Sequence, residues 1–193
     1  MEDAVQKAID IVRQGGIIIY PTDTAFGIGC RMDNPEAVDR LFSIRKRPRS
    51  QATPVLVSSN EMALTYFYEP SDIVRRFMDL YWPGALTIVA LCKTQLIHSP
   101  IRGNGASVGL RMPNHPTLIR VISAIEVPLL GPSANFHGDA TPYRFEDLNP
   151  ALTALVDYVI PGICSVQSAS TVVDCSTDPY RIIRQGAVSL HKI

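Results

Sequence analysis

The stretch GGIIIYPTDTAFGIGC, residues 15–30, sets the fold class of this chain. Its two glycines end the segment 2–14, whose apolar residues recur at helical spacing. The β-branched run 17–20 follows and stops at Pro21, which predicts a short buried strand. The polar residues Thr22–Thr24 then turn the chain. A helix, a buried strand and a polar turn in this order indicate the start of an α/β domain.

The alternation of helices and strands continues along the chain. Further helices are predicted at 35–47, 60–68, 71–80 and 115–125, with the end of another at 151–156. Asn34 is predicted to cap the first of these, with Pro35 in its first turn. Strands are predicted at 54–57, 85–91 and 107–112, an apolar run at 127–130, and late strands at 172–173 and 181–183, with 85–91 in the centre of the sheet. Because no repeat or linker interrupts this pattern, we expect one α/β domain over residues 1–193.

The composition excludes several classes of protein. Among 193 residues, Lys and Arg number 18 and Asp and Glu number 18, so the chain is not broadly basic and any nucleic-acid site must be a local patch. The chain has no apolar run near the ~18 residues of a membrane span, and residues 1–10 do not resemble a secretory signal. The four cysteines lack CxxC spacing, so free thiols in a cytoplasmic protein are expected, without a metal held by protein side chains.

The sequence holds none of the common glycine-rich phosphate loops, neither GxxxxGK[ST] nor GxGxxG. Bound ATP would therefore have to be held by side chains, and the run Arg45-Lys46-Arg47-Pro48-Arg49 is the obvious candidate. The same run could instead be a solvated helix end, where positive charge is favourable, or a small RNA-binding patch.

Three other polar features follow or interrupt apolar segments. Thr22–Thr24 could be a ligand site or only a turn in which Asp23 bonds the backbone. Ser133 and Asn135 sit two apart and could point to one side, or they too could serve a turn. Arg111 lies inside an apolar strand, so it must face solvent or meet an anion. With no GxSxG elbow and no Cys visibly paired with His, the sequence does not suggest a covalent nucleophile.

Taken together, the segments resemble the YrdC-type threonylcarbamoyl-AMP synthases over nearly the whole chain, to about Gly186. The short tail, ending at residues 191–193, resembles the single-domain form of the family. The motifs that carry the resemblance occur in the family's order: GGIIIYPTDTAFGIGC (15–30), IRKRP (44–48), PVLV (54–57), WPGALTIV (82–89), SVGLRMPNHP (107–116), GPSAN (131–135), STVVD (170–174) and IIRQG (182–186).

The resemblance implies a fold and a reaction. The fold would be a twisted, open, mostly mixed sheet with flanking helices and a concave ligand surface. The reaction would join L-threonine, bicarbonate and ATP into threonylcarbamoyl-adenylate and pyrophosphate, with Mg²⁺ bridging the phosphates. The product would feed the threonylcarbamoyl modification of adenosine in tRNA, so tRNA or tRNA-modification proteins are possible partners, and no membrane is involved.

Matched position by position, the resemblance also implies roles for individual residues. Those on the threonine side are Thr24, Arg111, Ser133 and Ser170. Those on the ATP side are Arg45, Arg47, Gln51, Ser107, Asn135, Tyr143 and Arg184. Arg45 and Arg47 would also stabilise charge on the phosphates, and the resemblance identifies no base for the threonine amine.

The chain departs from the family pattern at three places. Arg45 stands where the family usually has Lys, residues 51–53 read Gln-Ala-Thr where Lys-Pro-Leu is common, and Phe26 replaces a Tyr. Two of these lie on the phosphate side, which leaves a second hypothesis open: an RNA-binding or regulatory module that keeps the fold without the synthesis. A third hypothesis, a carbamoyl-adenylate activity like that of larger hydrogenase-maturation proteins, would require domains that this sequence does not contain.

Overall fold

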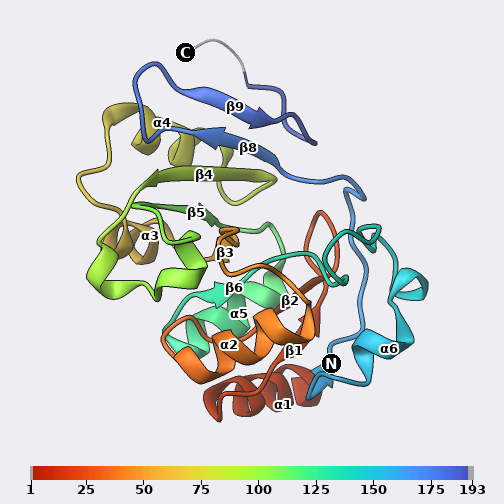
Figure 1. Ribbon diagram of the computed structural model, residues 1–193. Coiled ribbons are helices and arrows are strands. Elements are labelled where there is room, and N and C mark those ends of the chain that lie inside the picture. The colour runs from red at the N-terminus through yellow and green to blue at the C-terminus, as the bar shows by residue number, and fades with distance from the viewer. Residues whose placement is uncertain (1, 191–193) are drawn as a thin grey trace.

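The computed structural model describes residues 2–190, so the tail 191–193 lies outside the described part. Within it the chain forms a mixed α/β structure with two β-sheets and helices packed around them (Figure 1). This confirms the predicted fold class of a mixed sheet with flanking helices.

The helices begin and end close to the predicted positions. Asn34 caps its helix as expected, since its Oδ1 accepts a hydrogen bond from the Ala37 N–H at 3.0 Å, and Ser59 caps the next helix through the Met62 N–H at 3.1 Å. The α-helices are α1 (Glu2–Arg13), α2 (Pro35–Ile44), α3 (Asn60–Tyr66), α4 (Asp72–Tyr81), α5 (Pro116–Ile125) and the short α6 (Pro150–Thr153). Three 3₁₀ turns that the sequence analysis did not predict lie at Thr94–Leu96, Ser99–Arg102 and Phe145–Asp147.

The larger sheet has six strands in the order β6-β3-β5-β4-β8-β9. Their bounds are β3 (Val55–Leu56), β4 (Leu86–Leu91), β5 (Ser107–Arg111), β6 (Leu129–Leu130), β8 (Thr171–Asp174) and β9 (Arg181–Arg184). The pairs β3–β5 and β4–β8 are parallel and the other pairs are antiparallel, so the sheet is mixed. Strand β4 lies inside the sheet, as its apolar sequence predicts.

A second, smaller sheet was not predicted. It has three strands in the order β2-β1-β7, where β1 is Ile18–Tyr20, β2 is Gly27–Gly29 and β7 is Tyr158–Val159. Strand β2 consists mostly of glycine, which has low strand propensity, and β7 has only two residues, too few to show an alternating pattern. Neither strand could therefore be predicted from the sequence. Bridges from Gly27 to Ser133 and from Arg31 to Leu129 connect this sheet to the larger one.

Two apolar cores support these sheets. Helices α1 and α5 pack together against β1 and bury residues such as Val12, Val121 and Ile122. The larger core runs under α2, α4 and the six-stranded sheet. All four cysteines are free, and burial raises the pKa of the Cys30 thiol to about 12, so that thiol is unreactive at neutral pH. Of the described helices, none has the length and apolar character to cross a membrane.

The close approach of β2 to β6 gives a testable prediction about stability. A Cβ added at Gly29 would lie 1.9 Å from the Leu130 carbonyl oxygen, so Gly29→Ala must push the two strands apart. We expect a loss of about 1–3 kcal/mol in the free energy of unfolding, measured by denaturant titration. Gly105→Ala is the control, because its Cβ would meet only the Arg102 carbonyl at 3.3 Å in an exposed loop. Equal stability of the two variants would contradict this account.

Candidate functional site

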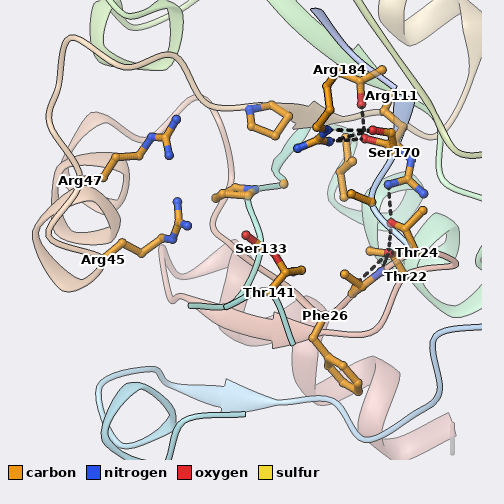
Figure 2. A pocket seen from close by; sticks show the side chains of 18 residues that line it. Thr22, Thr24, Phe26, Arg45, Arg47, Arg111, Ser133, Thr141, Ser170 and Arg184 are labelled. Atoms are coloured by element: carbon orange, nitrogen blue, oxygen red, sulfur yellow. Dashed lines mark hydrogen bonds between the residues drawn. The ribbon is translucent and has the colours of Figure 1, made fainter. Parts of the chain in front are cut away.

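A cavity of about 210 Å³ lies where strand ends of the larger sheet face the β1–β2 turn (Figure 2). Segments far apart in sequence line it: the turn after β1, the residues after α2, strands β3, β4 and β5, the segments after β6 and before β8, and the end of β9. Seven of the predicted site residues line it: Thr24, Arg45, Arg47, Arg111, Ser133, Ser170 and Arg184. The structure thus brings all four residues of the predicted threonine side together with three of the ATP side.

Four predicted ATP-side residues do not line this cavity. Ser107 begins β5, whereas Arg111 ends it, so the two lie roughly 13 Å apart at about 3.3 Å per residue. The length of β5 thus separates Ser107 from the cavity end of the strand, and its role on the ATP side stays a prediction. Gln51 is exposed, and Tyr143 lies two residues beyond the lining residue Thr141. Asn135 lies behind the lining and contacts it through Arg45 and Ser133.

The turn after β1 is built on the hydroxyl of Thr22. This oxygen accepts hydrogen bonds from the N–H groups of Thr24 at 3.0 Å and Ala25 at 3.1 Å, and it donates to the Ala25 carbonyl at 2.7 Å. The Thr24 hydroxyl lies 3.0 Å from it. Such a side-chain-bonded turn presents Thr24 to the cavity in one orientation. The alternative that the Asp23 side chain bonds the backbone of this turn is wrong. The Thr22 hydroxyl makes those bonds, and the Asp23 carboxylate accepts a bond from Arg111 instead.

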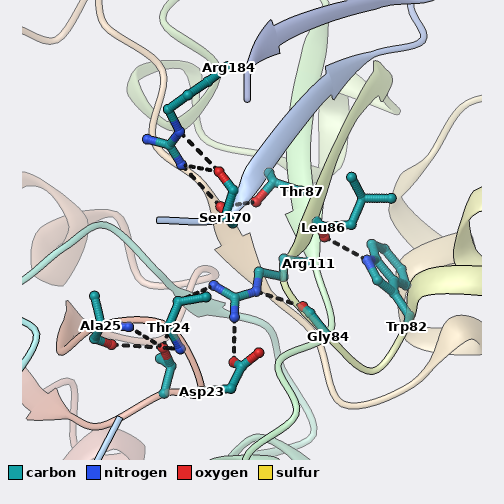
Figure 3. Close-up of polar contacts among 11 residues, drawn as sticks. Asp23, Thr24, Ala25, Trp82, Gly84, Leu86, Thr87, Arg111, Ser170 and Arg184 are labelled. Carbon is teal, nitrogen blue, oxygen red and sulfur yellow. Dashed lines mark hydrogen bonds and ion pairs between the residues drawn. The ribbon is translucent and has the colours of Figure 1, made fainter. Parts of the chain in front are cut away.

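Arg111 is buried and meets an anion, which settles the choice left open by the sequence (Figure 3). Its Nη2 donates to the Asp23 carboxylate, its Nη1 to the Thr24 hydroxyl at 2.7 Å and its Nε to the Gly84 carbonyl at 2.9 Å. Burial lowers the pKa of Arg111 and the Asp23 charge opposes that shift. The guanidinium has five N–H groups, so two are not used by these bonds.

Ser170 connects the larger sheet to the cavity. Its hydroxyl lies 3.0 Å from the Thr87 hydroxyl and accepts a bond from Arg184 Nη2 at 3.1 Å. The Ser170 carbonyl also accepts from Nε and Nη2 of Arg184, at 3.0 and 2.9 Å, which fixes the guanidinium at the rim (Figure 3). The sequence analysis missed Thr87 as a lining residue, although a threonine that interrupts an otherwise apolar strand was a usable signal.

Arg45 is buried on the other side of the cavity (Figure 2). Its Nε donates to the Asn135 carbonyl at 3.0 Å and its Nη2 to the Asn135 side-chain oxygen at 3.1 Å, and the Ser133 hydroxyl donates to that same oxygen at 2.7 Å. Its Nη1 is buried and has no hydrogen-bond partner. Burial, and then the nearby Arg47 charge, lower the pKa of Arg45 to about 10, so it remains charged at neutral pH. A buried cation with an unused donor is suited to receive an anion.

The other cations of the basic run have separate environments. Arg47 lines the cavity, donates to the carbonyls of Gln51 and Ala52, and has its pKa lowered by burial. Lys46 lies 5.1 Å over the ring of Phe136, and Arg49 pairs with Asp39 at 2.9 Å. The run is therefore neither a uniformly solvated helix end nor a continuous basic patch, because two of its arginines face the cavity and the other cations do not.

The cavity is an anion-binding environment. Four guanidinium groups line it, from Arg45, Arg47, Arg111 and Arg184, and no carboxylate, histidine or cysteine is among the lining residues. Within residues 2–190 the structure has no group of three or more His, Cys, Asp or Glu side chains that could hold a metal ion.

Arg184 allows a first test of this environment. We expect Arg184→Ala to weaken ATP binding about tenfold or more and to leave L-threonine affinity within threefold, because it removes a positive charge at the rim and leaves Arg111 in place. Isothermal titration with each ligand measures both effects. Arg181→Ala is the control, since that side chain begins the same strand but pairs with Asp174 at 2.8 Å. If the two variants bind ATP equally well, Arg184 has only a structural role.

The fold and the site define a class: α/β proteins with a cationic, hydroxyl-lined cavity at the strand ends of the sheet. The family model Sua5_yciO_yrdC, described as telomere recombination, matches residues 10–186. The chain belongs to this Sua5/YciO/YrdC family.

Individual relatives are consistent with this assignment. A Bacillus subtilis protein named threonylcarbamoyl-AMP synthase is 26% identical over 193 residues, which cover 98% of this chain and 55% of the relative. The crystal structure of P. abyssi Sua5 complexed with L-threonine superposes with a TM-score of 0.88 at 26% identity, covering 94% of this chain and 54% of that one. The crystal structure of E. coli YciO gives a TM-score of 0.86 at 26% identity, covering 96% and 90%. The chain therefore spans about half the length of the B. subtilis and P. abyssi relatives, but most of the length of YciO.

Proposed function

We propose that this protein is an L-threonylcarbamoyladenylate synthase, which forms threonylcarbamoyl-AMP and pyrophosphate from L-threonine, bicarbonate and ATP for tRNA modification. The observation that carries the proposal is a cavity lined by four arginines together with the hydroxyls of Thr24, Ser133 and Ser170. The names of the synthase relatives and the L-threonine bound to P. abyssi Sua5 support the choice of ligands.

The threonine side of the cavity suits a small amino acid. Arg111 offers two unused N–H groups, a number that matches the two oxygens of a carboxylate. Hydroxyls of Thr24 and Ser170 lie on the same side of the cavity as Arg111 and suit the polar groups of threonine (Figure 2). These hydroxyls can fix the orientation of a small polar substrate by hydrogen bonding.

The opposite side suits a triphosphate. Arg45 and Arg47 lie across the cavity from Arg111, whereas Arg184 lies beside Ser170 on the Arg111 side (Figure 2). Three guanidiniums without a carboxylate partner favour a polyanion over a neutral ligand. Because Asn135 accepts two bonds from Arg45 and is itself held by the Ser133 hydroxyl, the Arg45 fork is oriented before a ligand binds, which lowers the entropy cost of binding.

The chemistry then needs positioning and charge stabilisation rather than a covalent enzyme intermediate. The threonine amine attacks the carbon of bicarbonate, and loss of water from the adduct gives a carbamate. A carbamate oxygen then attacks the α-phosphorus of ATP and displaces pyrophosphate. Holding the reactants together can supply about 7–11 kcal/mol of the barrier. Arg45 and Arg47 would stabilise charge that develops on the phosphates, and Mg²⁺ brought with ATP would share that charge. We expect the product to be passed to tRNA-modification proteins in the cytoplasm.

The test is turnover of ATP to AMP and pyrophosphate by the purified protein. We expect pyrophosphate release only when L-threonine, bicarbonate and ATP are all present, with threonylcarbamoyl-AMP detected by mass spectrometry. Omission of each substrate in turn is the control. The absence of AMP formation with all three substrates, together with retention of a tRNA in a filter-binding assay, would favour the RNA-binding module instead.

A further inference from the structure

We propose that Asp23 is the positioning residue of the threonine site, which fixes the Arg111 guanidinium so that its two unused N–H groups face a substrate carboxylate. The identity of that substrate rests on the proposed function. Neither the resemblance nor the cavity lining assigns Asp23 a role, since its side chain is not among the lining groups.

The first support is the geometry of the buried pair. Asp23 and Arg111 are only 4% and 6% exposed, and Arg111 Nη2 donates to Asp23 Oδ1. Two further bonds, from Nη1 to the Thr24 hydroxyl and from Nε to the Gly84 carbonyl, also hold the Arg111 guanidinium. Three bonds from three different nitrogens define both the position and the rotation of a planar guanidinium.

The second support is that Asp23 itself is held on a fixed turn. The Val166 N–H donates to the Asp23 carbonyl at 2.7 Å, which connects the turn to the segment before β8. On the neighbouring residue, Thr22 closes the turn with its own side chain. The main chain at Asp23 is therefore held in place, which limits how far its carboxylate can follow Arg111 if that side chain moves.

The third support is the charge balance. Arg111 is the only one of the four cavity arginines paired with a carboxylate. Arg45, Arg47 and Arg184 have no carboxylate partner, whereas the Arg111 charge is partly balanced by Asp23, which accepts from Nη2. Such an arrangement favours one carboxylate at Arg111 and a polyanion toward Arg45 and Arg47, which lie across the cavity (Figure 2).

The experiment compares Asp23→Ala and Asp23→Asn with wild type by isothermal titration, using L-threonine, ATP and L-threoninamide, which lacks the carboxylate. We expect Asp23→Ala to weaken L-threonine at least tenfold and to leave ATP and L-threoninamide within twofold. Asp23→Asn keeps a neutral acceptor in nearly the same shape, so we expect a loss of at least threefold but less than that of Ala. Asp174→Asn is the matched control, a buried carboxylate that pairs with Arg181 away from the cavity, and it should bind all three like wild type.

The outcomes separate this proposal from the proposed function. An unchanged L-threonine affinity in a folded Asp23→Asn protein overturns the positioning role, as does an equal loss for L-threonine and L-threoninamide, which a merely structural role would give. If Asp23→Ala does not fold, the L-threonine affinity of Asp23→Asn alone tests the positioning role. If wild type itself binds ATP but no L-threonine, the proposed function fails first, and the positioning role for that substrate fails with it.

Discussion

Threonine-dependent turnover is expected to disappear in Arg111→Ala. The substitution removes the guanidinium proposed to hold the threonine carboxylate and, with it, the bonds to Asp23, Thr24 and Gly84. A lost charged hydrogen bond costs about 1.5–3 kcal/mol, and each 1.4 kcal/mol changes an affinity about tenfold. We therefore expect threonine affinity to fall by at least one to two orders of magnitude. The measurement is L-threonine affinity by calorimetry together with pyrophosphate release.

Stability must be measured alongside, because Arg111→Ala also leaves Asp23 buried without its counter-ion. Breaking a buried pair in this way costs about 3–5 kcal/mol of stability. Arg111→Lys is the matched variant, since it keeps a positive charge near Asp23 but loses the planar fork. We expect it to remain folded, to bind ATP, and still to lose at least tenfold in L-threonine affinity. Normal threonine affinity in the lysine variant would refute bidentate recognition of the carboxylate.

Adenylate formation is expected to fall nearly to background in Arg47→Ala. Arg47 faces the cavity beside Arg45, and the two are proposed to share the phosphate charge. Pyrophosphate release at subsaturating ATP is the measurement. Arg45→Lys should retain activity within about tenfold, because the ammonium keeps the charge but can replace only part of the Asn135 contacts.

Arg49→Ala provides the control within the same basic run. Arg49 pairs with Asp39 and its side chain is 55% exposed, so its removal should change turnover less than twofold. A wild-type rate in Arg47→Ala would contradict a phosphate role for the run and make an RNA-binding module the better hypothesis. Equal losses in Arg47→Ala and Arg49→Ala, each of which removes one positive charge, would indicate a nonspecific charge effect.

Several parts of the fold could be predicted because the signal is local. The helices α1, α2, α4 and α5 carry apolar residues at helical spacing, and Asn34 with Pro35 marks one start. Strands β4 and β5 are long apolar runs between turn residues. The small sheet was missed because β2 is two glycines around one isoleucine, and its glycines are needed for contacts with Tyr20 and Leu130 that only the tertiary structure creates.

The site shows the same division. The sequence alone determined the residue types at the cavity: hydroxyls after β1, arginines after α2 and at the end of β5, and Ser133 after an apolar run. Only the tertiary structure decided which of them meet. It placed Ser107 at the far end of β5 from Arg111, split the basic run between cavity and surface, and paired Asp23 with Arg111 across 88 positions of the chain. Short-range patterns fix local conformation and chemistry, whereas the direction of a side chain and its distant partner follow from how the sheets and helices pack.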